Sequence, residues 1–310
     1  MVALMHVLVL GVTGMLGSMV YDYLRRNPVI QVAGTCRMLE RHTQMPPGAT
    51  FQLDAEENVA STLCSIWERF NPHYVVNCIG ITNIHCRDTD AKGVLSAVRV
   101  NALFPHAVAD FLSSVQANTK VIHITTDCVF SGRAGCYDET ALHDPVDFYG
   151  KSKSLGEVQT DGWLNVRCSI VGPEIYGRKS LLEWFLSHGP GSPINGYSHH
   201  TWNGVTTLQF AKFCEEIVLQ NSFDRLRAAT HTLHWVPNQS VSKYELLEIL
   251  NQIYKRKCRI EKVAVPPPAI DRSLTSRYLR LPLLPMENAI EQLKDYCDRV
   301  SYCGEVQAPA

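Results

Sequence analysis

The chain has 310 residues, enough for one large domain or two unequal ones around a hydrophobic core. Its 29 Lys and Arg residues nearly balance its 30 Asp and Glu residues, and this near-neutral charge argues against nucleic acid or a membrane surface as partner. The eleven cysteines are scattered without the spacing of a zinc site, so we expect free thiols, no metal site and a cytoplasmic location.

The first half of the sequence alternates short apolar runs with helical patterns. The run Met5–Leu10 leads into a glycine-rich turn and a predicted helix. Further strands are predicted at Val29–Cys36, Thr50–Leu53, Tyr74–Ile79 and Lys120–Thr125, and helices at Ala55–Phe70 and Val94–Val115. Apolar strands that alternate with helices are typical of a parallel sheet covered on both faces. We therefore predict an α/β fold with a Rossmann-type doubly wound parallel sheet.

The regular alternation ends after a predicted strand at Trp163–Ile170. We expect residues 1–172 to form the dinucleotide-binding domain, and residues 173–310 to form mainly a smaller α/β substrate lobe that is interleaved with the first. The polar stretch Gly189–Gly204 is predicted to be a loop over a site. Helices at Thr207–Leu219, Ser242–Lys255 and Met286–Arg299 and strands at Thr232–Val236 and Arg259–Val265 are assigned to this lobe.

Glycines recur at every third position between the first strand and the first helix, at Gly11, Gly14 and Gly17. The first permits a tight turn, the second lets the backbone approach a pyrophosphate, and the third lets the helix pack on the strand. The N-terminus of the helix adds N–H donors and partial positive charge. The turn therefore predicts a dinucleotide cofactor.

The residues after the second and third strands bear on which dinucleotide binds. Arg37 stands where an acidic residue would bind a ribose 2′-hydroxyl, and a guanidinium there pairs with a 2′-phosphate. We therefore expect NADP(H), with NAD(H) as the alternative, and Arg41 as a second candidate for the phosphate; a solvated surface arginine is the other interpretation of Arg37. Asp54 either binds adenine or caps a helix.

Tyr149 and Lys153 lie four residues apart, which places them on one face of a helix. An ammonium beside a phenol lowers the pKa of the phenol, so Tyr149 would donate a proton to a carbonyl oxygen. Thr126, at the end of the fifth strand, is our choice for the hydroxyl that positions this carbonyl, with the adjacent Thr125 facing either the packed interior or the nicotinamide. We expect the nicotinamide side to be completed by Cys78, Ile79, Gly80 and Asn101.

Several motifs in order together resemble the dTDP-4-dehydrorhamnose reductase group of extended short-chain dehydrogenases: GVTGMLG, TTDCVFSG, YGKSK followed by Leu-Gly-Glu, and Val-Arg-Cys-Ser at 166–169. This resemblance implies NADPH-dependent reduction of the 4-keto group of a nucleotide-activated 6-deoxy sugar. It also implies a catalytic triad of Thr126, Tyr149 and Lys153. The residues that it implies at the pyrophosphate are Gly11, Thr13, Gly14, Met15 and Leu16.

Cys128 departs from the pattern of this group, which usually has tyrosine there. In the related GDP-fucose synthase, a cysteine at this spacing acts in epimerisation together with a histidine. An epimerase-reductase that uses Cys128 with His188, His199 or His200 is therefore an alternative, and a packed thiol is another. We place the neighbouring Asp127 and Val129 beside the substrate too.

The substrate lobe offers weaker signals. Trp202 is expected to stack on a nucleotide base while Asn203 reads the edge of that base. A late arginine is expected on the diphosphate, and of Arg272 and Arg277 we choose Arg277. A regulatory subunit built on the same scaffold, like the beta subunit of methionine adenosyltransferase, is a non-enzymatic alternative, and either a monomer or a homodimer fits the sequence.

Overall fold

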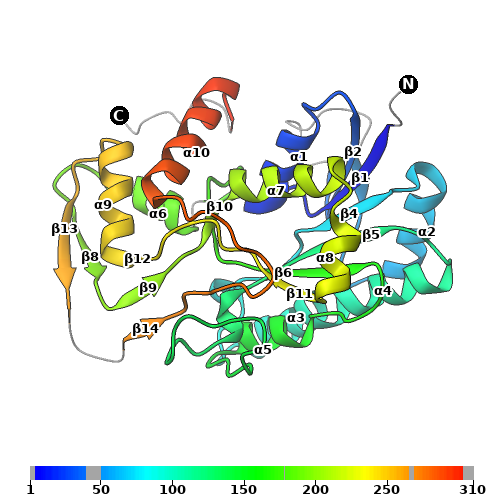
Figure 1. The fold of residues 1–310 in the computed structure, drawn as a ribbon, viewed down its shortest axis with the longest axis horizontal. Coiled ribbons are helices and arrows are strands. Elements are labelled where there is room, and N and C mark those ends of the chain that lie inside the picture. The colour runs from blue at the N-terminus through cyan, green and yellow to red at the C-terminus, as the bar shows by residue number, and fades with distance from the viewer. Residues whose placement is uncertain (1–3, 40–49, 178, 265–268, 303–310) are drawn as a thin grey trace.

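The computed structural model describes residues 4–39, 50–177, 179–264 and 269–302. Its centre is a seven-stranded parallel sheet in the order β11-β6-β5-β4-β1-β2-β3 (Figure 1). The strands are β1 (Met5–Leu10), β2 (Ile30–Cys36), β3 (Thr50–Gln52), β4 (Tyr74–Asn77), β5 (Lys120–Thr125), β6 (Trp163–Arg167) and β11 (Thr232–His234). The predicted Rossmann-type sheet is thus confirmed.

Helices cover both faces of this sheet (Figure 1). One face carries α1 (Met15–Leu24), α7 (Thr207–Leu219) and α8 (Phe223–Ala229). The other carries α2 (Val59–Phe70) and α4 (Phe104–Ser114), with α3 (Ala91–Ala97) and α5 (Phe148–Leu155) packed beside them on a π-helical turn, Val98–Leu103. Side chains of β1 alternate between the two layers, because successive residues of a strand point to opposite faces.

β1 lies between β2 and β4. After β1 the chain continues to β2 on one side of it and later crosses to form β4 on its other side. At such a switch point the connections after neighbouring strands separate, which opens a crevice at the carboxyl ends of the strands. The glycine turn after β1, the segment after β4 and the Thr125-Thr126 segment of β5 all lie at this edge. The fold therefore brings the predicted cofactor and catalytic residues to one place.

The smaller lobe contains three short sheets, seen beside the main sheet in Figure 1. Their strands are β7 (Ile170–Val171) with β10 (Val205–Thr206), β8 (Pro193–Tyr197) with β13 (Arg259–Val263), and β9 (His200–Trp202) between β12 (Val241–Ser242) and β14 (Ile270–Asp271). The helices of the lobe are α6 (Leu181–Leu186), α9 (Lys243–Ile253) and α10 (Met286–Val300). Within the described ranges, no helix is long and apolar enough to cross a membrane.

The predicted loop at Gly189–Gly204 is wrong, because this stretch contains strands β8 and β9. Ile194 and Gly196 are buried in β8 while their neighbours are exposed, a period of two that the Gly and Pro content obscures. Glycine at position 196 lets β8 pack closely on Tyr244, because a β-carbon there would lie 2.9 Å from the Cα atom of Tyr244.

Two elements assigned from sequence to the second lobe belong to the main layer. Helix α7 packs against α1, and β11 is the edge strand of the central sheet, paired with β6. The buried Leu233 in β11 continues the core of that sheet. Residue 172 therefore marks a change of pattern along the chain, while in space the two halves interleave.

Candidate active site

The turn between β1 and α1 shows why glycines are needed there. Gly11 has a φ of +83°, and a β-carbon on it would lie 2.8 Å from the Cγ1 atom of Ile79. A β-carbon on Gly17 would lie 2.2 Å from the Gly11 carbonyl oxygen. Gly14 is the N-cap residue and has no side chain to accept from the first N–H groups of α1. These donors stay available to an anion such as a pyrophosphate.

Two adjoining cavities form one cleft along the carboxyl edge of the sheet. The first, of about 790 Å³, is lined by Gly11, Thr13, Arg37, Asp54 and Ile79, among others. The second, of about 610 Å³, is lined by Met15, Leu16, Thr125, Thr126, Cys128, Tyr149 and Lys153, among others. Both are lined by Gly14, Cys78, Gly80, Ile81, His85 and Tyr176. An elongated cleft with a basic residue at one end and a phenol and an ammonium at the other suits a dinucleotide.

The catalytic candidates are held by α5 and by the end of β5. The Asp147 side chain caps α5 by accepting a hydrogen bond from the Gly150 N–H, and this starts the helix next to Tyr149. The buried Lys153 extends toward β5, with its Nζ atom 3.4 Å from the Ile124 carbonyl oxygen. The hydroxyl of Thr126 accepts from the Cys128 N–H and donates to a carboxyl oxygen of Asp127, both at 3.1 Å.

The protonation states differ from the expectation that Lys153 lowers the pKa of Tyr149. Burial raises the pKa of Tyr149 above its ordinary value, and the hydrogen bond with Thr126 only partly opposes this effect. The free energy lost when a phenolate is removed from water is greater here than the free energy that its neighbours supply. The phenol thus keeps its proton at neutral pH, as a proton donor must. Burial lowers the pKa of Lys153 to about 8, with Cys78 and Glu157 opposing the shift.

Two expected cofactor residues have structural tasks. The Asn101 amide accepts from the Ile81 N–H at 2.8 Å and donates to the Ile81 carbonyl at 2.9 Å and to the Ser152 hydroxyl at 3.0 Å. It thereby fixes the segment after β4, which lines the cleft. Asp54 accepts from the Glu56 N–H in a turn, and α2 begins only at Val59, so Asp54 is not its cap. Arg41 lies outside the described residues.

Cys128 lies in the catalytic cavity but without the histidine that epimerisation was expected to use. Burial raises its pKa to about 12, and the Arg272 guanidinium, with Nη1 3.5 Å from the sulfur, opposes this shift. His188, His199 and His200 are absent from the described lining of this cavity. The ring of His188, for example, bonds to the Trp184 carbonyl.

The residues predicted to bind substrate from the smaller lobe make other contacts in the structure. The amide of Asn203 is buried and makes two hydrogen bonds with the backbone of Leu274, so it cannot read a base edge. Trp202 lies over Gly204 and packs on the main core. Arg277 is exposed beside Asp138. Arg272, the other candidate, is the arginine beside Cys128, with its Nη1 atom 3.5 Å from the sulfur.

Asp127 and Val129 are both buried, and neither belongs to the described lining of the cavity. The lining also contains polar side chains that the sequence did not single out, among them His85, Glu174, Tyr176 and Lys179. The segment 174–179 follows β7, where the expected alternation had ended, and offered no motif.

Comparison with known proteins shows the family of the chain. The family model described as the RmlD substrate binding domain matches residues 5–278. The chain belongs to this family. The match covers the glycine turn, Thr126, Tyr149, Lys153 and most of the smaller lobe, so the family relationship extends past the motifs of the first half.

Individual members of the RmlD family are more distant. The chain is 34% identical over 94 residues to a dTDP-4-dehydrorhamnose reductase from Aggregatibacter actinomycetemcomitans, which is 30% of each chain. It is 31% identical over 152 residues to methionine adenosyltransferase 2 subunit beta from Danio rerio, 49% of this chain and 42% of that one. These matches span less than half of each curated relative.

A solved structure supports the fold of the whole chain. A dTDP-4-dehydrorhamnose reductase from Bacillus anthracis in complex with NADP matches with a TM-score of 0.72 and 19% identity, over 94% of this chain and 99% of that one. At this identity the likeness establishes the RmlD-type fold, including the interleaved lobe.

Proposed function

We propose that the protein is an NADPH-dependent oxidoreductase that reduces the 4-keto group of a nucleotide-diphosphate 6-deoxy sugar. The observation that carries the proposal is the meeting of Thr126, Tyr149 and Lys153 in one cavity that continues into the glycine-turn cleft. Membership of the RmlD family and relatives named dTDP-4-dehydrorhamnose reductase support this substrate class. The smaller lobe, residues from 173 onward, would hold the sugar nucleotide, with the Arg272 guanidinium 3.5 Å from the Cys128 sulfur.

The cleft fits a nicotinamide dinucleotide. Glycines at 11 and 17 let the turn after β1 pack closely, because a β-carbon there would meet Ile79 or the Gly11 backbone. Arg37 would pair with a 2′-phosphate, Asp54 would accept from adenine, and Lys153 would hold ribose hydroxyls. When bound, the nicotinamide supplies the hydride for the ketone carbon.

The residues of the chain then move the proton. Tyr149, kept protonated by burial, donates its proton to the carbonyl oxygen as negative charge develops there. The Thr126 hydroxyl orients the carbonyl and shares that charge through a hydrogen bond. The ammonium of Lys153 favours the phenolate that remains, because an opposite charge nearby stabilises it.

One experiment tests the proposal directly. NADPH or NADH is offered with a panel of nucleotide-linked 4-keto-6-deoxy sugars, and absorbance at the nicotinamide band is followed. We expect oxidation of NADPH with at least one sugar. Tyr149→Phe should lower turnover by about 10²- to 10⁴-fold, because the proton donor is lost, while NADPH affinity stays the same. Unchanged turnover would mean that another group supplies the proton.

The likeness to methionine adenosyltransferase 2 subunit beta favours a second candidate, a regulatory subunit that binds NADP(H) without turnover. The same experiment separates the two candidates. Tight NADPH binding without oxidation by any sugar in the panel would contradict the reductase and leave the regulatory subunit.

A further inference from the structure

The sheet face beneath α5 carries polar side chains where an apolar surface is expected. Buried parallel strands usually have apolar residues on both faces. Here two alternate positions in each of three neighbouring strands are polar and buried, and these positions lie in register across the sheet. They are His123 and Thr125 in β5, Asn165 and Arg167 in β6, and Thr232 and His234 in β11.

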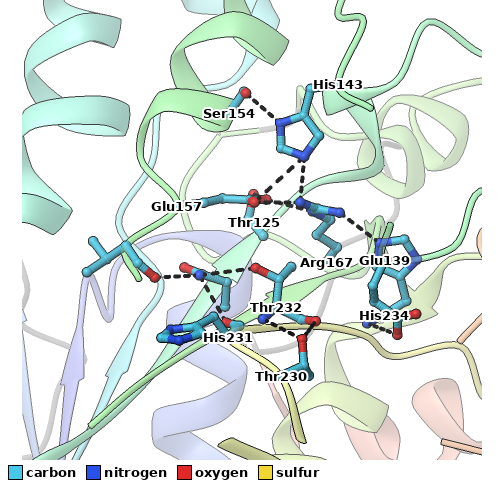
Figure 2. Close-up of polar contacts among 12 residues, drawn as sticks. Thr125, Glu139, His143, Ser154, Glu157, Arg167, Thr230, His231, Thr232 and His234 are labelled. Carbon is cyan, nitrogen blue, oxygen red and sulfur yellow. Dashed lines mark hydrogen bonds and ion pairs between the residues drawn. The ribbon is translucent and has the colours of Figure 1, made fainter. Parts of the chain in front are cut away.

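Arg167 is the centre of this polar face (Figure 2). Its Nε and Nη2 atoms donate to the two carboxyl oxygens of Glu157 at 2.7 and 2.6 Å. The same guanidinium donates to the Nε2 atoms of His143 and His234. The side chains of Arg167 and Glu157 are each only 5% exposed, so this is a buried, bidentate ion pair.

The two histidines must be neutral. Arginine has no acceptor, so each Nε2 atom accepts a hydrogen bond and each proton lies on Nδ1. His234 then donates from Nδ1 to the Tyr137 and Thr275 carbonyl oxygens, and His143 donates to the Ser154 hydroxyl. Four of the five guanidinium N–H groups thus have an acceptor, and no second positive charge lies among these partners.

This network attaches the catalytic helix to the sheet. Glu157 follows α5 directly, and its Oε1 atom also accepts from the Thr125 hydroxyl at 3.1 Å, next to Thr126. Ser154, in the last turn of α5, is held by His143. We propose that Glu157 is a positioning residue, which fixes Lys153 and Tyr149 relative to Thr126 and keeps a negative charge beside the Lys153 ammonium. This inference rests on the proposed function for its catalytic consequence.

A role in the fold alone would not require a charge. A buried ion pair adds little net stability compared with well-packed apolar residues, because both ions lose their hydration. The charged and titratable groups around Lys153 are Cys78 after β4, His123 in β5, Tyr149 in α5 and Glu157. Of these, Glu157 is the carboxylate, ion-paired with Arg167, and its charge opposes the effect of burial on the pKa of Lys153.

The test replaces the charge and keeps the shape, in Glu157→Gln. The titration of Lys153 is followed by NMR of the ¹³C-labelled lysine Cε atoms, with the signal assigned by Lys153→Met. We expect the midpoint, about 8 in the natural chain, to fall by roughly one pH unit, since a nearby negative charge is removed and Arg167 is left unpaired. The alkaline limb of the turnover–pH profile should move by the same amount, with kcat reduced about tenfold and KM little changed.

Asp22→Asn is the matched control. Asp22 also forms an ion pair with an arginine, Arg26, and accepts from Tyr296, but it lies at the far end of α1. This variant should be less stable and titrate at Lys153 like the natural chain. If Glu157→Gln does not fold, Glu157→Asp retains the charge with a shorter side chain: it should keep the Lys153 midpoint while kcat falls.

The outcomes separate this inference from the proposed function. A folded Glu157→Gln variant with the natural Lys153 midpoint would overturn the inference, as would a Glu157→Asp variant with a lowered midpoint. The lysine titration needs no substrate, so a shifted midpoint in a protein that reduces no sugar would uphold the charge effect and contradict the reductase alone.

Discussion

At the scale of single residues, Gly80 shows how a missing side chain makes a site. The segment after β4 passes so close to α5 that a β-carbon on Gly80 would lie 2.9 Å from the Lys153 Nζ atom and 3.4 Å from the Asn101 amide oxygen. The Lys153 side chain is buried, so a β-carbon at this position would displace the ammonium from its place in the site. Glycine at position 80 therefore leaves the room that the Lys153 ammonium occupies.

Gly80→Ala is expected to displace the ammonium and weaken NADPH binding by about tenfold, with a loss of about 1–3 kcal/mol in unfolding free energy from overpacking. Fluorescence titration with NADPH and urea unfolding measure the two effects. Gly189→Ala is the control, because nothing lies within 4 Å of its β-carbon, and both quantities should stay at natural values. Equal NADPH affinities in the two variants would contradict this account of Gly80.

Sequence reasoning located the residues whose task depends on local spacing. The glycine turn and the Tyr149–Lys153 pair depend on residues only a few positions apart, so the sequence shows them as motifs. Asn203 depends on Leu274, 71 residues away, and the choice between Arg272 and Arg277 depends on how β14 passes the catalytic cavity. Such distant pairings leave no periodic signal.

At the scale of elements, the strands of the central sheet were predicted from their short runs, but the membership of β11 in that sheet was not. β11 has the same short apolar pattern as a lobe strand, and only its pairing with β6 places it in the main sheet. The alternating polar positions in β5, β6 and β11 were a readable signal: polar residues at a period of two within predicted buried strands indicate a shared polar face.

The interleaving predicts that residues 1–172 do not fold alone. This fragment lacks β11, which leaves β6 as an open edge, and it lacks α7, which covers the apolar face of α1. We expect the fragment to aggregate or to unfold without a cooperative transition in urea, followed by circular dichroism, whereas the full chain unfolds cooperatively. A cooperative transition of the fragment would show that the boundary near residue 172 is a true domain limit.

At the scale of the whole molecule, the neutral histidines make the free energy of unfolding depend on pH. Burial and then the Arg167 charge lower the pKa of His234 to about 4. In the unfolded chain the pKa of His234 has its ordinary value of about 6.5. As the pH is lowered, the unfolded state therefore binds a proton near pH 6.5, whereas the folded state binds it only near pH 4. Stability is therefore greatest above pH 6.5 and falls as the pH is lowered toward 4.

This residue should account for a loss of about 3 kcal/mol in unfolding free energy across that interval. Urea unfolding at several pH values measures it, with His234→Gln as the comparison, because glutamine accepts a hydrogen bond without titrating. The difference in unfolding free energy between the two proteins should shrink as the pH falls. A constant difference from pH 7 to pH 4 would rule out His234 as the source.

The place of β11 at the edge of the sheet also has a consequence for synthesis of the protein. When β6 leaves the ribosome, its partner strand lies some 60 residues further along the chain, a delay of about 3–12 s at ordinary rates of translation. Through that interval the nascent chain presents the unpaired edge of β6 and the uncovered apolar face of α1. We expect chaperone binding to concentrate in this window, and slower translation between the codons for residues 172 and 234 to favour aggregation over folding.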